Sequence, residues 1–135
     1  MNDYLVKATT TDGMFRAYAI TAQQMVATAQ GDHDTWAASS VALGRTLIAT
    51  TMLATSVNKN DEAITVKING QGPAGEIVAD ADSKGNVKGF IHNPHVQLPN
   101  DGKHQMTSGK AVGLMAFWRL LKPLKVRILI PAQCH

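Results

Sequence analysis

Residues 36–56 constrain the fold of this chain more than any other segment does. Their larger apolar side chains recur at spacings of three to four residues, the period of a helix, and small residues fill much of the remaining surface. Arg45 is the only formally charged residue among them. A helix with so little charge and such small side chains is expected to be enclosed by other elements. Because an enclosed charge is costly unless it is paired, Arg45 should reach a carboxylate or the surface, as an anchor between layers or as a ligand-binding arginine.

A β-hairpin and a short helix are predicted before this long helix. Residues 3–9 and 14–20 alternate apolar and polar side chains on either side of Asp12-Gly13, a pair that suits the tight turn of a hairpin. Thr21 and Gln24 fit a capping box, which would open a helix that runs to about Gln30. The sequence Gly-Asp-His-Asp that follows is expected to end this helix.

Three short strands are predicted after the long helix. They cover residues 63–68, 76–79 and 87–91, and a glycine-rich connection and a turn join them. The whole pattern predicts an α+β fold, in which a β-hairpin and a three-strand meander pack around the enclosed alanine-rich helix. The shorter helix is expected to lie outside.

Length and composition restrict the class of protein. A chain of 135 residues is long enough for one domain with a real core. The apolar runs are short and interrupted, so no segment is expected to span a membrane. The N-terminal MNDYLVKA lacks the layout of a signal peptide, and a cytoplasmic location is therefore expected.

Charge is divided unevenly along the chain. Residues 1–113 carry nine Lys and Arg against ten Asp and Glu, which argues against a nucleic-acid-binding stripe across the body. We expect two parts, a partial core domain at residues 1–113 and an atypical basic tail at residues 114–135. The tail adds four basic residues and no acidic one: Arg119, Lys122, Lys125 and Arg127.

The glycine-rich connection at residues 70–75, Gly-Gln-Gly-Pro-Ala-Gly, could be taken for a phosphate-binding loop. Phosphate-binding loops open a helix, whereas strands are predicted on both sides of this one, and Pro73 removes one backbone amide. A structural connection between strands is the better interpretation, because glycine supplies backbone angles that other residues avoid.

Metal binding has few candidate ligands. His92 and His95 lie three residues apart in a proline-containing loop, and a site would need further ligands such as His104. The single cysteine, Cys134, can form neither an internal disulfide nor a four-cysteine zinc site. We expect solvated loop histidines, no bound metal and no cofactor in this chain.

Catalytic groups are equally sparse. Asp80 and Asp82 resemble a carboxylate pair, but they run into a turn, where aspartate commonly serves local hydrogen bonding. Ser39 and Ser40 lie inside the predicted long helix, and no nucleophile elbow is present. No catalytic, cofactor-binding or metal-binding residue is assigned, and the chain is predicted not to be an enzyme.

Four short pieces of the chain, in this order and spacing, resemble the 33 kDa chaperonin family, the redox-regulated heat-shock holdases of bacteria. The resemblance covers roughly residues 3–113, which correspond to part of the family's N-terminal core domain. The four pieces are residues 42–45 (Ala-Leu-Gly-Arg), 68–73 (Ile-Asn-Gly-Gln-Gly-Pro), 77–82 (Ile-Val-Ala-Asp-Ala-Asp) and 85–90 (Gly-Asn-Val-Lys-Gly-Phe).

The resemblance implies an ATP-independent chaperone that holds unfolding proteins during oxidative stress. Its partners would be unfolded or partly folded client proteins, with a homodimer allowed and neither nucleic acid nor membrane involved. Family members switch through a C-terminal zinc centre of four cysteines, in CxC and CxxC pairs. Because this chain lacks those cysteines, the resemblance carries over the fold and the holding of clients but not the redox switch.

The resemblance ends at Gly113. One possible coding sequence, read with a shift of one nucleotide within the Gly113 codon, gives a different amino-acid sequence after this residue. That sequence restores the family pattern and an excess of acidic residues. The tail is therefore interpreted as a frameshift product that truncates the core domain and could leave the fragment without function. The alternative is a native tail that acts as a small-ligand or membrane-surface binding module, although Pro123 and Pro131 argue against a continuous helix there.

Overall fold

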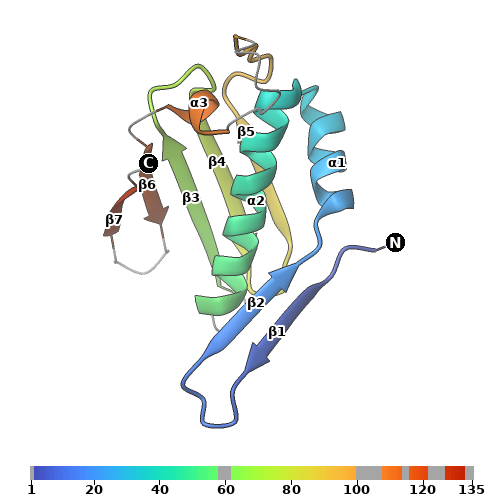
Figure 1. Ribbon diagram of the computed structural model, residues 1–135, viewed down its shortest axis with the longest axis vertical. Coiled ribbons are helices and arrows are strands. Elements are labelled where there is room, and N and C mark those ends of the chain that lie inside the picture. The colour runs from blue at the N-terminus through green and yellow to red at the C-terminus, as the bar shows by residue number, and fades with distance from the viewer. Residues whose placement is uncertain (1, 58–61, 100–107, 114–115, 122–126, 133–135) are drawn as a thin grey trace.

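Seven strands and three helices make up the computed structural model of this chain over the residues that it describes, 2–57, 62–99, 108–113, 116–121 and 127–132 (Figure 1). The helices are α1 (Gln23–His33), α2 (Ala37–Val57) and α3 (Ser108–Val112). The strands are β1 (Leu5–Thr9), β2 (Arg16–Ile20), β3 (Ala63–Asn69), β4 (Glu76–Asp82), β5 (Val87–Ile91), β6 (Ala116–Leu121) and β7 (Arg127–Ala132).

These strands form two antiparallel sheets. β1 and β2 make a two-stranded hairpin, and the second sheet has the order β5-β4-β3-β6-β7. The predicted hairpin, the three-strand meander and the α+β class are therefore confirmed. The tail adds β6 beside β3 and β7 beside β6, so those residues form strands and not a helix. Pro131 lies in β7, the outermost strand, which is a position where a sheet tolerates proline.

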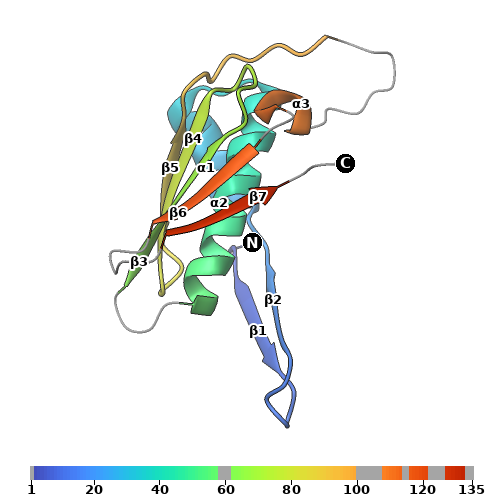
Figure 2. The ribbon, with the colours of Figure 1, turned by 90° about the vertical axis from the view of Figure 1, so that its left-hand side faces the viewer.

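The core lies between α2 and one face of the larger sheet (Figures 1 and 2). Alternate residues of β3 and β4 are buried there, as expected for strands with one face against a helix. Leu43 and Leu47 of α2 meet them, and α1 packs against α2. The fully buried large side chains include Leu43, Ile64, Val66 and Ile77.

Small residues let these layers approach closely. A Cβ atom at Gly44 would lie 2.9 Å from a methyl carbon of Val26, at the contact between α2 and α1. A Cβ atom at Gly89 would lie 2.9 Å from a methyl carbon of Leu47, at the contact between α2 and β5. The enclosed position predicted for the long helix is thus confirmed, because α1 lies close against it at Gly44 and β5 lies close against it at Gly89.

The buried threonines of α2 place polar hydroxyl groups in the core, and each of these hydroxyls is hydrogen-bonded. Thr46, Thr50, Thr51 and Thr55 each donate a hydrogen bond to the carbonyl four residues earlier, over 2.7–2.9 Å. This local bonding satisfies groups that would otherwise be costly to bury. By length and composition alone α2 could cross a membrane, but most of its residues are packed inside this fold. Arg45 is exposed, so it reaches the surface, as expected.

The capping-box prediction for α1 is wrong. Its N-cap is Ala22 and makes no side-chain capping bond. The Thr21 hydroxyl instead accepts a hydrogen bond from the backbone N–H of Tyr4 at 2.9 Å. The helix also continues past Gln30 to His33, because the chain leaves it only where Asp34 adopts a left-handed conformation, with φ 47°.

Candidate functional site

The hairpin of β1 and β2 carries an exposed, uncharged face. The hairpin projects beyond the end of α2, and its tip lies far from the larger sheet (Figures 1 and 2). Tyr4 is 57% exposed, Val6 49% and Phe15 69%. Cross-strand pairing of Val6 with Ala19 and of Ala8 with Ala17 makes this face continuous. We call it the outer face, and it comprises Tyr4, Val6, Ala8, Phe15, Ala17 and Ala19.

The opposite face of the hairpin is turned toward α2. Leu5 and Ile20, which pair across the strands, lie beside Thr51 of α2. The ammonium group of Lys7 donates to the backbone carbonyl of Thr55 at 2.9 Å. This carbonyl is in the last turn of α2, where the helix dipole favours a cation. The hairpin is therefore fixed at its base, and its outer face is directed away from the helix.

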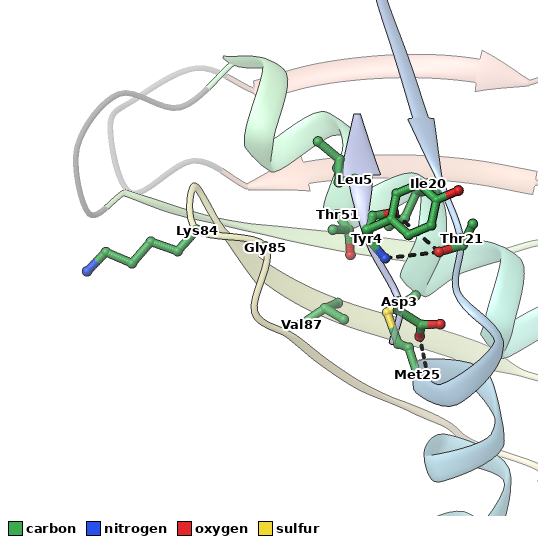
Figure 3. Close-up of a pocket in the computed structure, with 10 residues that line it drawn as sticks. All are labelled: Asp3, Tyr4, Leu5, Ile20, Thr21, Met25, Thr51, Lys84, Gly85 and Val87. Carbon is green, nitrogen blue, oxygen red and sulfur yellow. Dashed lines mark hydrogen bonds between the residues drawn. The ribbon is translucent and has the colours of Figure 1, made fainter. Parts of the chain in front are cut away.

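A long-range helix cap fixes the base of the hairpin as well. The Asp3 carboxylate accepts hydrogen bonds in the first turn of α1 from the backbone N–H groups of Gln24, at 3.2 Å, and Met25, at 2.7 Å. Figure 3 shows the bond from Met25. These N–H groups have no partner within the helix, and a carboxylate there also complements the helix dipole. Asp3 thus supplies the cap that Thr21 was predicted to supply.

Local hydrogen bonds hold the tip of the hairpin in shape. The Asp12 carboxylate accepts from the Thr10 hydroxyl and from the Met14 backbone N–H, and Gly13 adopts a positive φ of 71°. The hydrogen bond from Thr10 is the main reason that the pKa of Asp12 lies below its usual range. The turn leaves Met14 75% exposed and Phe15 69% exposed. Two large apolar side chains are therefore exposed to solvent on a turn that local hydrogen bonds hold in shape.

A cavity of about 360 Å³ lies at the base of the hairpin, between the hairpin, the two long helices and the turn that precedes β5. Apolar side chains supply much of its lining, and Lys84 extends away from the other lining residues (Figure 3). It is lined by Asp3, Tyr4, Leu5, Ile20, Thr21, Met25, Thr51, Lys84, Gly85 and Val87.

The glycine-rich connection is structural, as predicted. It joins β3 to β4, and its amides are already bonded: the N–H of Gly72 donates to the Val112 carbonyl and that of Ala74 to the Ala111 carbonyl, both at 2.9 Å. A Cβ atom at Gly72 would lie 2.4 Å from the carbonyl carbon of Val112. The glycines therefore allow the end of α3 to dock on the loop, and these two amides are not free to bind a phosphate.

The loop histidines do not assemble a metal site among the described residues. His95 Nε2 lies 3.1 Å from a carboxylate oxygen of Asp34, and the His95 ring lies 5.1 Å from that of Trp36, so this histidine joins its loop to the turn between α1 and α2. His92 is exposed. His104 and Cys134 lie outside the described residues. The zinc centre of four cysteines does not fit a chain with one cysteine.

The remaining polar candidates serve the fold. Asp82 accepts hydrogen bonds from the Lys84 and Asn86 backbones and from the Asn86 side-chain amide, and the last of these is the main reason that its pKa is lowered. Asp80 accepts a hydrogen bond from the Thr65 hydroxyl on the neighbouring strand. Ser39 donates to the Asn93 carbonyl at 3.0 Å. The structure thus places Asp82 in the turn predicted for it and Ser39 in a contact between α2 and the loop after β5.

Sequence reasoning missed the outer face of the hairpin. The signal that could have found it is the absence of charge at every second position, from Tyr4 to Ala8 and again from Phe15 to Ala19. The other set of positions holds Leu5 and Ile20, which are also apolar. The alternation of side chains in the sequence therefore does not show which face of the hairpin packs against α2.

Comparison with known proteins gives a consistent result. The model of the Hsp33 protein family matches residues 3–126. The 33 kDa chaperonin of Lactiplantibacillus plantarum is 52% identical over 122 residues, which are 90% of this chain and 41% of that protein. The 33 kDa chaperonin of Levilactobacillus brevis is 54% identical over 114 residues, which are 84% of this chain and 39% of that protein.

A solved structure agrees with the sequence relatives. The crystal structure of the 33 kDa chaperonin (heat shock protein 33 homolog) from Thermotoga maritima matches with a TM-score of 0.83 and 27% identity, over 97% of this chain and 45% of that one. This chain spans about two-fifths of the length of the curated relatives, 41% and 39% of the two named above. The boundary predicted at Gly113 stays a prediction. The chain belongs to the Hsp33 family, whose members are 33 kDa chaperonins, a class of heat-shock chaperone.

Proposed function

We propose that this chain holds unfolding client proteins without ATP, as a part of the core domain of an Hsp33 chaperone. The observation that carries the proposal is the outer face of the hairpin. Contiguous exposed apolar surface on a folded protein marks a site of interaction with other macromolecules. Clients that have begun to unfold expose apolar side chains, and burying such side chains against this face removes both surfaces from water.

The holding activity of this chain should not depend on redox state. The family's switch works through four cysteines, and this chain has one, Cys134. Client binding would therefore rest on surface that is exposed in every redox state. We further propose that the chain acts in the cytoplasm, needs no cofactor, carries out no catalysis and uses neither nucleic acid nor membrane as a partner.

The alternative that the basic tail is a small-ligand or membrane-binding module has less support. β6 and β7 take up much of the tail and pair in the larger sheet, and β6 lies directly beside β3. A strand within a sheet is not available as an amphipathic helix on a membrane surface. No specific observation favours that module over client holding.

An aggregation assay tests the proposed function. A chemically unfolded client is diluted into buffer with and without the chain, and light scattering is followed under dithiothreitol and under peroxide. The expected result is the same suppression of scattering in both conditions. No suppression in either condition would contradict the proposal, and vesicle binding measured in parallel would then favour the membrane module.

One variant controls for the thiol. Cys134 could join two chains through an intermolecular disulfide, which would mimic activation by oxidation. The assay is therefore repeated with Cys134→Ser. Reversible activation by peroxide that persists in this variant would show that redox control does not need the cysteines of the family, and would overturn the proposed independence from redox state.

A further inference from the structure

The hairpin has a free strand edge in addition to its apolar outer face. β1 pairs with β2 and with no other described strand. The N–H of Thr10 donates to the carbonyl of Phe15 at 3.1 Å, and the N–H of Thr21 to that of Tyr4 at 2.9 Å. These bonds show that every second residue from Tyr4 to Thr10 directs its backbone N–H and C=O groups toward β2.

The other set points outward. In an antiparallel pair, directly opposed residues alternate between hydrogen-bonded and non-hydrogen-bonded pairs. The bonds at both ends of the hairpin therefore place Val6 and Ala8 in the inward set and Leu5, Lys7 and Thr9 in the outward set. The backbone N–H and C=O groups of those three residues line the free edge of β1. Of the two strands, β2 packs more extensively on α2, which leaves the edge of β1 the more open.

We infer that this edge binds an extended segment of an unfolding client as a third strand of the hairpin, an inference that rests on the proposed function. Edge strands bind extended peptides through their backbone groups, while pockets and faces select side chains at alternate positions. An added strand would place one set of its side chains beside Val6 and Ala8 on the outer face. The surface therefore fits a segment with apolar residues at every second position.

Charge selects the residues between those positions. β1 and β2 contain Lys7 and Arg16 and no acidic residue. The intervening side chains of an added strand would lie on the same side as Lys7, so neutral or acidic residues fit there and basic ones do not. The expected client segment therefore has apolar residues at every second position and neutral or acidic residues between them.

The same lysine argues against a second copy of the chain as the occupant. Lys7 is the central residue of β1, Leu5–Thr9. Two copies of β1 paired antiparallel about a two-fold axis at their centres would place the two Lys7 side chains directly opposite each other. Like charges in that position are destabilising, and a lysine on an edge strand is a common device against self-pairing.

Amide hydrogen exchange locates the added strand. The full chain is measured alone and with reduced, carboxymethylated α-lactalbumin, a permanently unfolded protein. We expect exchange of the outward amides of Leu5, Lys7 and Thr9 to slow by about tenfold or more. The amides of Tyr18 and Ile20, which point outward on β2, serve as the internal control and should not change. Slowing at β2 alone, or at neither edge, would overturn the inference.

Two substitutions at one position separate the backbone from the side chain. Lys7→Pro removes the outward N–H, a change that edge strands tolerate, whereas Lys7→Ala keeps the N–H and removes the charge. In the aggregation assay, Lys7→Pro should raise the concentration needed for half-suppression by about fivefold over that of Lys7→Ala, the effect of losing one net hydrogen bond, because both variants lose the same side chain and only Lys7→Pro also loses the N–H. Equal loss in both variants would assign the effect to the side chain and contradict strand addition.

The outcomes separate this inference from the proposed function. If the chain suppresses client aggregation normally but amide exchange at β1 does not change with client, the holding function is supported and strand addition is overturned. If suppression is absent the holding function fails, and the exchange experiment with carboxymethylated α-lactalbumin decides strand addition by itself. Slowing at β1 that increases with chain concentration and needs no client would show self-pairing and overturn the inference. If Lys7→Pro fails to fold, exchange in the unmodified chain is sufficient for the test.

Discussion

The carboxylate of Asp3 caps the first turn of α1 from outside the helix, with one oxygen 2.7 Å from the backbone nitrogen of Met25. The two residues are 22 positions apart in the sequence. Through this contact and the bond of Lys7 to Thr55, the hairpin is held to both long helices. An exposed arm is thereby kept in one orientation without a core of its own.

The Asp3 cap predicts a loss of stability on its removal. Asp3→Ala should lower the free energy of unfolding by about 0.5–2 kcal/mol, the usual cost of losing an N-cap side chain. Asp32→Ala is the matched control, because Asp32 is exposed in the last turn of α1 and should change stability by less than about 0.5 kcal/mol. Urea denaturation followed by circular dichroism measures both. Equal effects would show that Asp3 does not act as a cap.

The enclosed position of α2 predicts a large cost for truncating its core side chains. Leu47→Ala should destabilise the chain by about 2–5 kcal/mol, because it leaves a cavity between α2 and the sheet. Val57→Ala, at a site that is 50% exposed at the end of the same helix, is the control. A loss below about 0.5 kcal/mol for Leu47→Ala in denaturant melts would mean that the helix does not form the core.

The docking of α3 on the glycine-rich connection predicts that this loop tolerates no side chain at Gly72. Gly72→Ala should cost about 1–3 kcal/mol, because its Cβ atom would overlap the backbone of Val112. Gly109→Ala adds the same methyl group in α3, where no atom of the described residues lies within 4 Å, and should not destabilise the chain. Thermal unfolding of the two variants checks this difference. A neutral Gly72→Ala would show that α3 is not seated on the loop.

The turn between β4 and β5 should depend on pH through Asp82. The pKa of this carboxyl is lower in the folded chain than its ordinary value of 3.8, chiefly because it accepts a hydrogen bond from the Asn86 side chain. Its stabilising contribution is therefore complete above the ordinary value and is lost as the pH falls through the lowered one. Amide chemical shifts of Lys84 and Asn86, followed from about pH 5 to about pH 2, should report the loss of their bonds to Asp82. In Asp82→Asn these shifts should not follow that titration, and a titration that persists there would assign it to another group.

The secondary-structure elements that could be predicted from the sequence are those that depend on short-range sequence patterns. The alternation of β3 and β4, the Asp-Gly turn of the hairpin and the period of α2 are all properties of neighbouring residues. The cap of α1 could not be predicted in this way, because Asp3 reaches it from a distant part of the chain. The candidate site was missed for a similar reason: Val6 and Leu5 are both apolar, and only the packing of the hairpin on α2 decides which of the two is exposed.

The most direct test of client holding by the hairpin is a comparison of two phenylalanines in the aggregation assay. Phe15 is 69% exposed at the hairpin tip, and Phe90 is 48% exposed on β5. Light scattering of a chemically unfolded client is measured with unmodified chain, Phe15→Ser and Phe90→Ser at equal concentrations. We predict that Phe15→Ser loses most of the suppression and that Phe90→Ser retains it. Full suppression by Phe15→Ser, or equal loss in both variants, would contradict the account.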